Sequence, residues 1–417
     1  MNPGVEGRAR TSKRPRLRHV EAFPIDHEGE RLLALRDPAG YTPAVALIPM
    51  ELLEIVSLFD GDHSVADIQA AVMRVHGERV PSRAIAALAE QLDEQGFLEG
   101  TRFAARRAAI DRAFLEAQQR PAAHAGGAYA GEAGELRAVI DGFFVSEGGA
   151  GPIAWGPDRT PRVRGLIAPH IDFHRGGPAY TWAYRDLAER GDADLFVILG
   201  TCHAGMEHPF ALTRKDFDTP LGVAPIDRDV VEALAARAGQ DCFGSELAHR
   251  GEHSIEFQAV FLRYLYAERR DVTIVPVLAS FVHEALARGD RPDADPRVPR
   301  FLDALADTLA ASGRRAVVIA GADLAHVGPR FGDPEPLAAS ELSQLAVEDR
   351  AMLETVAAGD ADAFFENAAR DGDRRRICGL SPIYALLRTL GRAPGAVRRY
   401  AQWPDPQGVV TFASVVF

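Results

Sequence analysis

The chain has 417 residues, which at about 100–200 residues per domain predicts two or three domains. Hydrophobic residues make up 47% and charged residues 25%, so a largely disordered or collagen-like chain is excluded. The 47 basic and 59 acidic residues give a net charge of −12. This charge argues against a general nucleic-acid binder, because phosphate affinity comes from clustered positive charge.

The cysteine content and the N-terminus bear on the cellular compartment. Three widely spaced cysteines, Cys202, Cys242 and Cys378, predict no disulfide framework and favour a reducing, cytoplasmic location. Residues 1–20 are rich in Arg and are predicted to be a basic disordered tail, since no apolar signal region follows them. No run of about 20 apolar residues occurs, so no membrane association is expected.

Residues 21–100 are predicted to form a small domain. A hairpin is expected over 31–48, and three helical patterns follow, at 49–59, from Ser64, and from Pro81 to Gly96, with a wing strand at 97–100. This order resembles a PqqD-like, winged-helix module. The third helix carries acidic residues, so docking of a peptide or protein is favoured over DNA binding.

A charged helix over 101–118 is predicted to link this module to a larger domain over 119–417. In that domain short β-branched runs alternate with helical patterns, which indicates an α/β fold with a mainly parallel sheet covered on both faces. The predicted strands are 163–168, 195–199, 272–278, 316–320 and 409–416. The predicted helices are 180–190, 228–238, 255–269, 300–311, 337–358, 360–371 and 382–390.

Histidine and aspartate follow three of these strands. His170 and His203 come directly after the first two runs, and Asp323 and His326 follow the run at 316–320. Ligand sites of α/β sheets collect at the carboxyl ends of the strands. Because imidazole is the commonest metal ligand, the pattern predicts a metal site at this edge.

A second cluster contains His249, Glu252, His253 and Glu256. His253 and Glu256 are spaced to share one face of a helix that Ser254 is predicted to cap. The cluster is interpreted either as a charged cap exposed to water or as a group that contacts substrate. One of its carboxylates could instead orient a metal-bound imidazole.

Cys378 precedes a predicted helix start at Ser381 and Pro382. The helix dipole and the arginines at 374–376 are predicted to lower the pKa of its thiol. A buried, inert cysteine is the alternative interpretation.

These motifs together resemble the Memo family, and more narrowly its bacterial members called AmmeMemoRadiSam system protein B. The matching strings stand in family order over about 119–417: His124-Ala125-Gly126-Gly127-Ala128-Tyr129, Ala168-Pro169-His170, Ile198-Leu199-Gly200-Thr201-Cys202-His203, Glu252-His253-Ser254-Ile255-Glu256, Ala322-Asp323-Leu324-Ala325-His326 and Ile377-Cys378-Gly379. The resemblance implies a fold similar to LigB-type, class III extradiol dioxygenases. It also implies iron or copper bound by His170, His203 and Cys378. The chain departs from the family after the first histidine, where Ile171-Asp172-Phe173-His174 replaces an aromatic motif, and at His203-Ala204.

Two functions are expected from these features. The first is a non-haem iron, Fe(II), or copper redox enzyme, which acts on a small molecule or peptide beside a radical-SAM partner; zinc is a further possible metal at the site. Its acid/base residues are predicted among His253, Asp323, His326 and Glu256. The alternative is a non-catalytic protein that binds metal or peptide and docks a partner.

Overall fold

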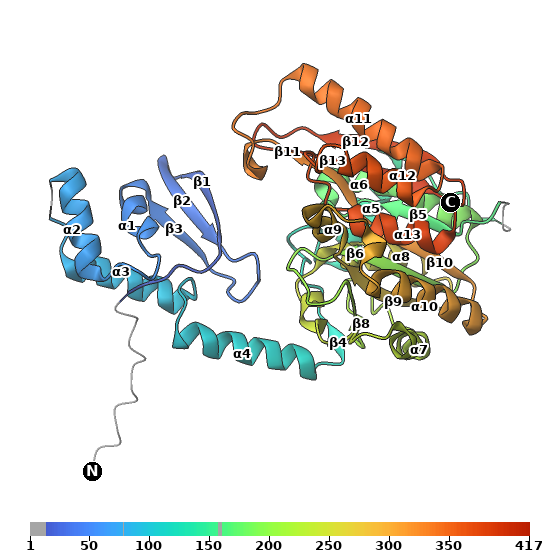
Figure 1. The fold of residues 1–417 in the computed structure, drawn as a ribbon, viewed down its shortest axis with the longest axis horizontal. Helices are drawn as coiled ribbons and strands as arrows, with labels where there is room; N and C mark the ends of the chain where they lie inside the picture. Colours follow the sequence, from blue (N-terminus) through green and yellow to red (C-terminus); the bar gives the residue numbers. More distant parts are fainter. Residues whose placement is uncertain (1–13, 78, 157–160) are drawn as a thin grey trace, which may run out of the picture. The chain divides into compact units, whose positions relative to one another are not determined.

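The computed structural model describes residues 14–77, 79–156 and 161–417, and it divides into two compact units, Met1–Glu116 and Ala117–Phe417 (Figure 1). We refer to them as the N-terminal and C-terminal units. No helix in the described part of the chain is long and apolar enough to cross a membrane.

The N-terminal unit is a small antiparallel sheet followed by helices. Its strands are β1 (Glu21–His27), β2 (Glu30–Arg36) and β3 (Val45–Pro49), in that order across the sheet. Its helices are the 3₁₀ turn η1 (Met50–Leu52), α1 (Leu53–Ser57), α2 (Val65–His76), α3 (Ser82–Gln95) and α4 (Thr101–Glu116). Ser64 caps α2 in a capping box with Asp67, as its sequence predicts, and Gly96 ends α3 in the left-handed conformation.

The predictions for this unit differ from the structure in three places. The strand β1 was not predicted, because its residues alternate only weakly between apolar and polar. Residues 97–100 form no wing strand; Leu98 makes only an isolated bridge with Leu17. Residues 1–13 of the predicted tail lie outside the described residues, whereas Arg18 is buried in the unit and pairs with Asp37 at 3.1 Å.

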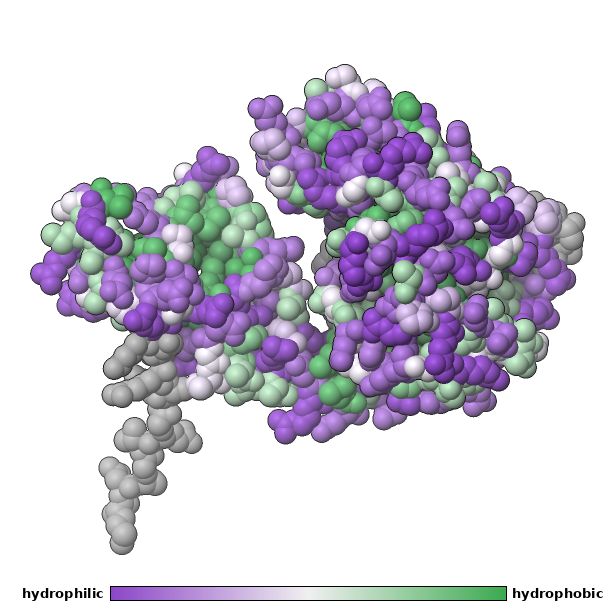
Figure 2. All heavy atoms as spheres, viewed as in Figure 1, coloured by the Kyte–Doolittle hydropathy of each residue, from purple (hydrophilic) through white to green (hydrophobic). Residues whose placement is uncertain are grey.

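One face of the N-terminal sheet exposes apolar side chains. Phe23 and Leu47 both flank Ala34 across the sheet, so they share one face, and they are 38% and 40% exposed. Val45 lies two residues from Leu47 on the same strand and is 51% exposed. Hydrophobic side chains gather over this sheet in the space-filling view (Figure 2).

The C-terminal unit is built on a mixed sheet that has eight strands among the described residues. The order is β11 (Asp323–Val327), β13 (Val409–Val416), β5 (Gly165–Ala168), β10 (Ala316–Gly321), β6 (Leu195–Thr201), β9 (Thr273–Ala279) and β7 (Phe210–Leu212), with β12 (Ala396–Trp403) paired to β13. The strands β5, β10, β6 and β9 are parallel, and antiparallel strands continue the sheet on both sides. The predicted parallel strands thus form the centre of the mixed sheet. A separate short pair joins β4 (Gln119–Arg120) to β8 (Asp216–Phe217).

Helices cover both faces of this sheet (Figure 1). They are α5 (Ala133–Val145), α6 (Phe173–Arg190), α7 (Arg228–Ala238), α8 (His253–Tyr266), α9 (Val282–Arg288), α10 (Arg297–Ser312), α11 (Ala339–Ala357), α12 (Ala361–Ala369) and α13 (Leu380–Leu390). All seven residues of β6 are buried, which explains its continuous apolar run. The buried sheet therefore fixes the positions of the residues that follow the carboxyl ends of its parallel strands.

Several strands of this unit were absent from the sequence-based expectation. The strand β11 follows β10 after one residue, and β12 contains two arginines and no buried residue. Neither strand has the continuous apolar run that would have predicted it from the sequence. Both are held in the sheet by pairing with β13. The helices α5 and α9 were also not predicted.

Candidate metal centre

Neighbouring parallel strands deliver the first candidate ligands. His170 lies two residues beyond β5, and His203 lies two residues beyond β6. The strand β10 pairs with both, so that Gly321 is opposite Ala168 on one side and Gly200 on the other. The residues after these positions therefore meet at one edge, as the sequence predicts.

The third histidine comes from a helix that approaches this edge closely. His253 is the first residue of α8. A Cβ placed on Gly321 would lie 2.3 Å from the Ser254 backbone oxygen, and a Cβ on Gly200 would lie 2.5 Å from the Ile255 side chain. The two glycines thus allow the start of α8 to rest on the ends of β10 and β6.

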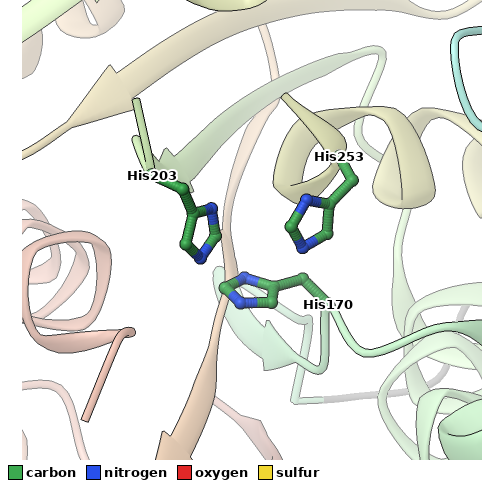
Figure 3. Close-up of side chains that lie close together, drawn as sticks. All are labelled: His170, His203 and His253. Carbon is green, nitrogen blue, oxygen red and sulfur yellow. The ribbon is translucent and has the colours of Figure 1, made fainter. Parts of the chain in front are cut away.

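The three imidazoles converge on one point (Figure 3). His170, His203 and His253 each offer a ring nitrogen, and these atoms all lie within 4.8 Å of one another. The ring centroids are 5.2 Å apart for His170 and His203, and 5.1 Å apart for His170 and His253. The Sγ atom of Cys378 lies 3.2 Å from the Nε2 atom of His170. The structure therefore groups two predicted ligands, His170 and His203, with His253, which was predicted as an acid/base residue, and it places the third predicted ligand, Cys378, beside His170.

Hydrogen bonds select which nitrogen each ring presents. His170 Nδ1 lies 2.9 Å from the Gly321 carbonyl oxygen, and His203 Nδ1 lies 3.1 Å from Glu252. His253 Nδ1 lies 3.3 Å from the same carboxylate. Carbonyl and carboxylate oxygens accept hydrogen bonds, so Nδ1 carries the proton in His170 and His203, and the Glu252 carboxylate beside His253 favours the same tautomer there by its charge. The Nε2 lone pairs are then the ones available to a metal.

Burial keeps two of these rings neutral. It lowers the pKa of His170 to about 4, and it lowers the pKa of His253 well below its usual value. At His203 burial acts in the same direction, but the Glu252 carboxylate outweighs it and raises the pKa. Neutral imidazoles are the form that binds metals.

The prediction of a lowered pKa for Cys378 is wrong. Burial raises the pKa of this thiol well above its usual value. The neighbouring arginines do not counteract burial, since Arg374, Arg375 and Arg376 pair with Glu348, Asp349 and Asp333. If Cys378 bound a metal ion, the positive charge of the ion would lower the pKa of the thiol and displace its proton.

Two helix starts also differ from prediction. The helix α8 is capped by Glu252, whose side chain accepts a hydrogen bond from the Ser254 N–H, so Ser254 is not the cap. The helix α13 begins at Leu380, before Ser381 and Pro382. Ser381 Oγ instead accepts hydrogen bonds from the Phe281 and Val282 N–H groups, at 3.0 Å each.

Asp323 and His326 lie beside the histidine cluster. One Asp323 oxygen accepts a hydrogen bond of 2.9 Å from the His170 backbone N–H, and the other lies 3.8 Å from His170 Nε2. Burial raises the pKa of Asp323 to about 6. His326 Nδ1 bonds to the Leu324 carbonyl at 3.1 Å, and burial lowers its pKa. Their acid/base roles stay predictions.

Glu256 is placed elsewhere by the structure. This buried carboxylate accepts hydrogen bonds from the Arg120 guanidinium, the Tyr129 hydroxyl and the His124 backbone N–H. It ties the start of the unit to α8 rather than bonding to the histidine side chains. Glu252 is the carboxylate that reaches the site, and sequence reasoning did not place it among the site residues. The signal was its position immediately before His253.

A cavity of about 360 Å³ adjoins the cluster. His203 and Cys378 form part of its wall, and Arg376, His283 and Asp373 form another part. The remaining lining residues are Thr201, Cys202, Ala279, Ser280 and Ser381. A small molecule in this cavity would therefore lie against two of the candidate ligands.

Comparison with known proteins relates this unit to one family. The family model described as Memo-like protein matches residues 120–416. A MEMO1 family protein of Aquifex aeolicus is 28% identical over 403 residues, covering 95% of this chain and 99% of the relative. A MEMO1 family protein of Methanopyrus kandleri is 30% identical over 308 residues, covering 72% of this chain and 99% of the relative.

Proposed function

Since the chain belongs to the Memo family, we propose that its C-terminal unit holds a redox metal at His170, His203 and Cys378 and acts as a non-haem metal enzyme. The proposal names Fe(II) first and copper second as the redox metal, whereas zinc would fit the same ligands but could not change its oxidation state. The observation that carries it is the convergence of three ring nitrogens within 4.8 Å of one another, with a thiol 3.2 Å from one of the rings.

The residues present fit such a metal. Imidazole suits iron, copper and zinc, and a thiolate adds a soft ligand. The Nδ1 atoms of His170 and His203 bond to protein oxygens and that of His253 lies 3.3 Å from the Glu252 carboxylate, which leaves Nε2 toward the centre. His253 offers a fourth donor. When bound, Fe(II) would supply electron-transfer chemistry that side chains alone lack.

The chain's own residues would position the substrate and move protons. A small molecule or a peptide side chain would enter the cavity beside His203 and Cys378. Asp323 is proposed as an acid/base group, since its pKa of about 6 lets it exchange a proton near neutral pH. His326 is retained as a second such group.

The finer assignments belong to the same proposal. We propose a likeness of the C-terminal unit to LigB-type, class III extradiol dioxygenases, and of the N-terminal unit to PqqD-like winged-helix modules. The mixed sheet with a parallel centre supports the first, and the sheet-then-helix order supports the second. A radical-SAM protein is the proposed partner, and a cytoplasmic location is proposed from the cysteine content.

Metal analysis after anaerobic purification tests the proposal. The wild-type protein is expected to carry close to one equivalent of metal, and His170→Ala is expected to lose most of it. His174→Ala is the matched control, because His174 is an exposed histidine in the first turn of α6. A metal-free wild-type protein, or equal metal in His170→Ala, would contradict the proposal.

A second candidate function is a non-catalytic protein that binds metal or peptide and docks a partner. The exposed apolar face of the N-terminal sheet, with Phe23, Val45 and Leu47, favours it. Turnover separates the two functions. Oxygen consumption that stays at background with metal loaded and candidate substrates present would favour the binding function.

A further inference from the structure

We infer that Glu252 is a positioning residue that sets the orientation of two metal-binding imidazoles at once, an inference that rests on the metal site proposed above. Sequence reasoning left open which carboxylate of the cluster, if any, would orient a histidine. The geometry assigns the role to Glu252, and it extends the role from one ring to two.

The side-chain contacts of Glu252 lead to the site or to the helix that this residue caps. Its Oε2 atom accepts a hydrogen bond of 3.0 Å from the His203 backbone N–H, and both oxygens lie 3.1 Å from His203 Nδ1. Its Oε1 atom lies 3.3 Å from His253 Nδ1 and accepts a hydrogen bond of 3.0 Å from the Ser254 N–H. The residue is only 5% exposed, so little water competes for these bonds.

The two rings are held in a shared orientation. The rings of His203 and His253 are stacked at 15°, with centroids 4.9 Å apart, although they come from a loop after β6 and from the start of α8. An imidazole that rotates by half a turn exchanges its two nitrogens. The Glu252 carboxylate, which hydrogen-bonds to Nδ1 of His203 and lies 3.3 Å from Nδ1 of His253, opposes that rotation in both rings and keeps Nε2 toward His170.

Glu256 shows that burial alone does not create this role. It lies one helical turn beyond Glu252 and is fully buried, but its oxygens bind Arg120, Tyr129 and the His124 backbone. Only Glu252 stands where the loop of His203 meets the N-terminus of α8.

The competing explanation is that Glu252 merely caps α8. Two variants separate capping from positioning. Glu252→Ser keeps a good N-cap side chain but is too short to bridge both rings. Glu252→Gln keeps the length, but its amide has one acceptor oxygen where the carboxylate has two. Asp360→Asn is the matched control, since Asp360 caps α12 by accepting a 3.0 Å hydrogen bond from the Ala363 N–H, on a helix that contributes no candidate ligand.

The first measurement is Co(II) affinity by competition titration of the full chain, with the visible spectrum recorded at saturation. Both Glu252 variants are expected to bind Co(II) roughly 10–100-fold more weakly than wild type and to show an altered ligand-field spectrum. Asp360→Asn is expected to keep wild-type affinity and spectrum. Affinity within twofold of wild type in both Glu252 variants would overturn the inference.

The second measurement needs no metal. Nitrogen-15 NMR of histidine-labelled apoprotein is expected to show His203 and His253 protonated at Nδ1 in wild type, and mixed tautomers in Glu252→Gln. Unchanged tautomers would overturn the inference. If wild type binds no metal but the tautomers shift as expected, the proposed metal function fails while the positioning of both rings by Glu252 stands.

Discussion

The Sγ atom of Cys378 lies 3.2 Å from the Nε2 atom of His170, although 208 positions separate them in the sequence. The approach depends on Gly379, the residue that caps α13. A Cβ at Gly379 would lie 2.4 Å from the Asp323 carbonyl oxygen. Glycine thus lets the start of α13 pack closely against the start of β11, and so places the thiol beside the histidine.

We expect Cys378→Ser to bind metal at least tenfold more weakly than wild type, because the variant loses a soft, anionic ligand. Cys202→Ser is the control, since Cys202 also lines the cavity but bonds to the Gly205 carbonyl at 3.7 Å. Competition titration with Co(II) or Zn(II) measures both. Equal affinity in the two variants would contradict Cys378 as a ligand and assign the third position to His253.

The close approach of α8 predicts that Gly321→Ala is harmful. The added methyl group would lie 2.3 Å from the Ser254 carbonyl oxygen, which is backbone and cannot rotate away. We expect a loss of about 1–3 kcal/mol in the free energy of unfolding, together with weaker metal binding.

Gly142→Ala is the control for this change. Gly142 lies inside α5 with nothing within 4 Å of an added Cβ, so it should gain up to about 1 kcal/mol from higher helix propensity. Urea unfolding followed by tryptophan fluorescence reports on the C-terminal unit, because all three tryptophans, Trp155, Trp182 and Trp403, lie in it. A Gly321→Ala variant as stable as wild type would contradict the close packing of α8.

The buried pair of Arg120 and Glu256 predicts a large structural effect. Both side chains are fully buried, and Arg120 also donates to the backbone oxygens of His249 and Glu252 at 2.8 and 2.7 Å. Arg120→Met leaves a buried carboxylate without its cation, which should cost about 3–5 kcal/mol of unfolding free energy.

An exposed ion pair supplies the comparison. Arg214 and Glu232 are each about half exposed, so Arg214→Met should cost less than about 1 kcal/mol. The same fluorescence-detected urea unfolding measures both variants. If the two variants lost similar amounts of unfolding free energy, burial would not determine how much each ion pair contributes to stability.

His249 predicts a pH dependence of stability. Burial lowers the pKa of this histidine to about 3. Between the unfolded value of about 6.5 and this folded value, the unfolded chain binds a proton that the folded chain does not. The free energy of unfolding therefore falls as pH falls through this window, by about 1.4 kcal/mol per pH unit from this group.

His249→Leu should remove that contribution. Between pH 7.5 and 5.0 wild type is expected to lose about 2 kcal/mol more than the variant. His174→Leu, at an exposed position, should keep the wild-type dependence. Metal-free protein is used because protonation of the metal ligands would otherwise release the metal and add to the pH dependence of the unfolding free energy. Equal slopes in wild type and His249→Leu would refute the prediction.

Much of the C-terminal unit was predictable because its information is local. The runs that became β6, β9, β10 and β13 are mostly apolar, since strands buried on both faces favour apolar side chains. The helix α7 was predicted at its observed bounds from the helical pattern at 228–238 alone. The positions of His170 and His203 after parallel strands likewise predicted that they would meet.

What tertiary structure alone decided is how groups from distant elements face one another. Glu252 and Glu256 are four residues apart in the sequence, which does not show their partners. In the folded chain Glu252 pairs with His203 and His253, whereas Glu256 pairs with Arg120. The sequence placed Cys378 near a helix start and three arginines, and only the structure showed those arginines paired with other carboxylates. Periodicity and spacing follow from the geometry of a single element. Burial and charge pairing depend on which elements surround a side chain, so the pKa of Cys378 and the role of Glu252 became readable only in the folded chain.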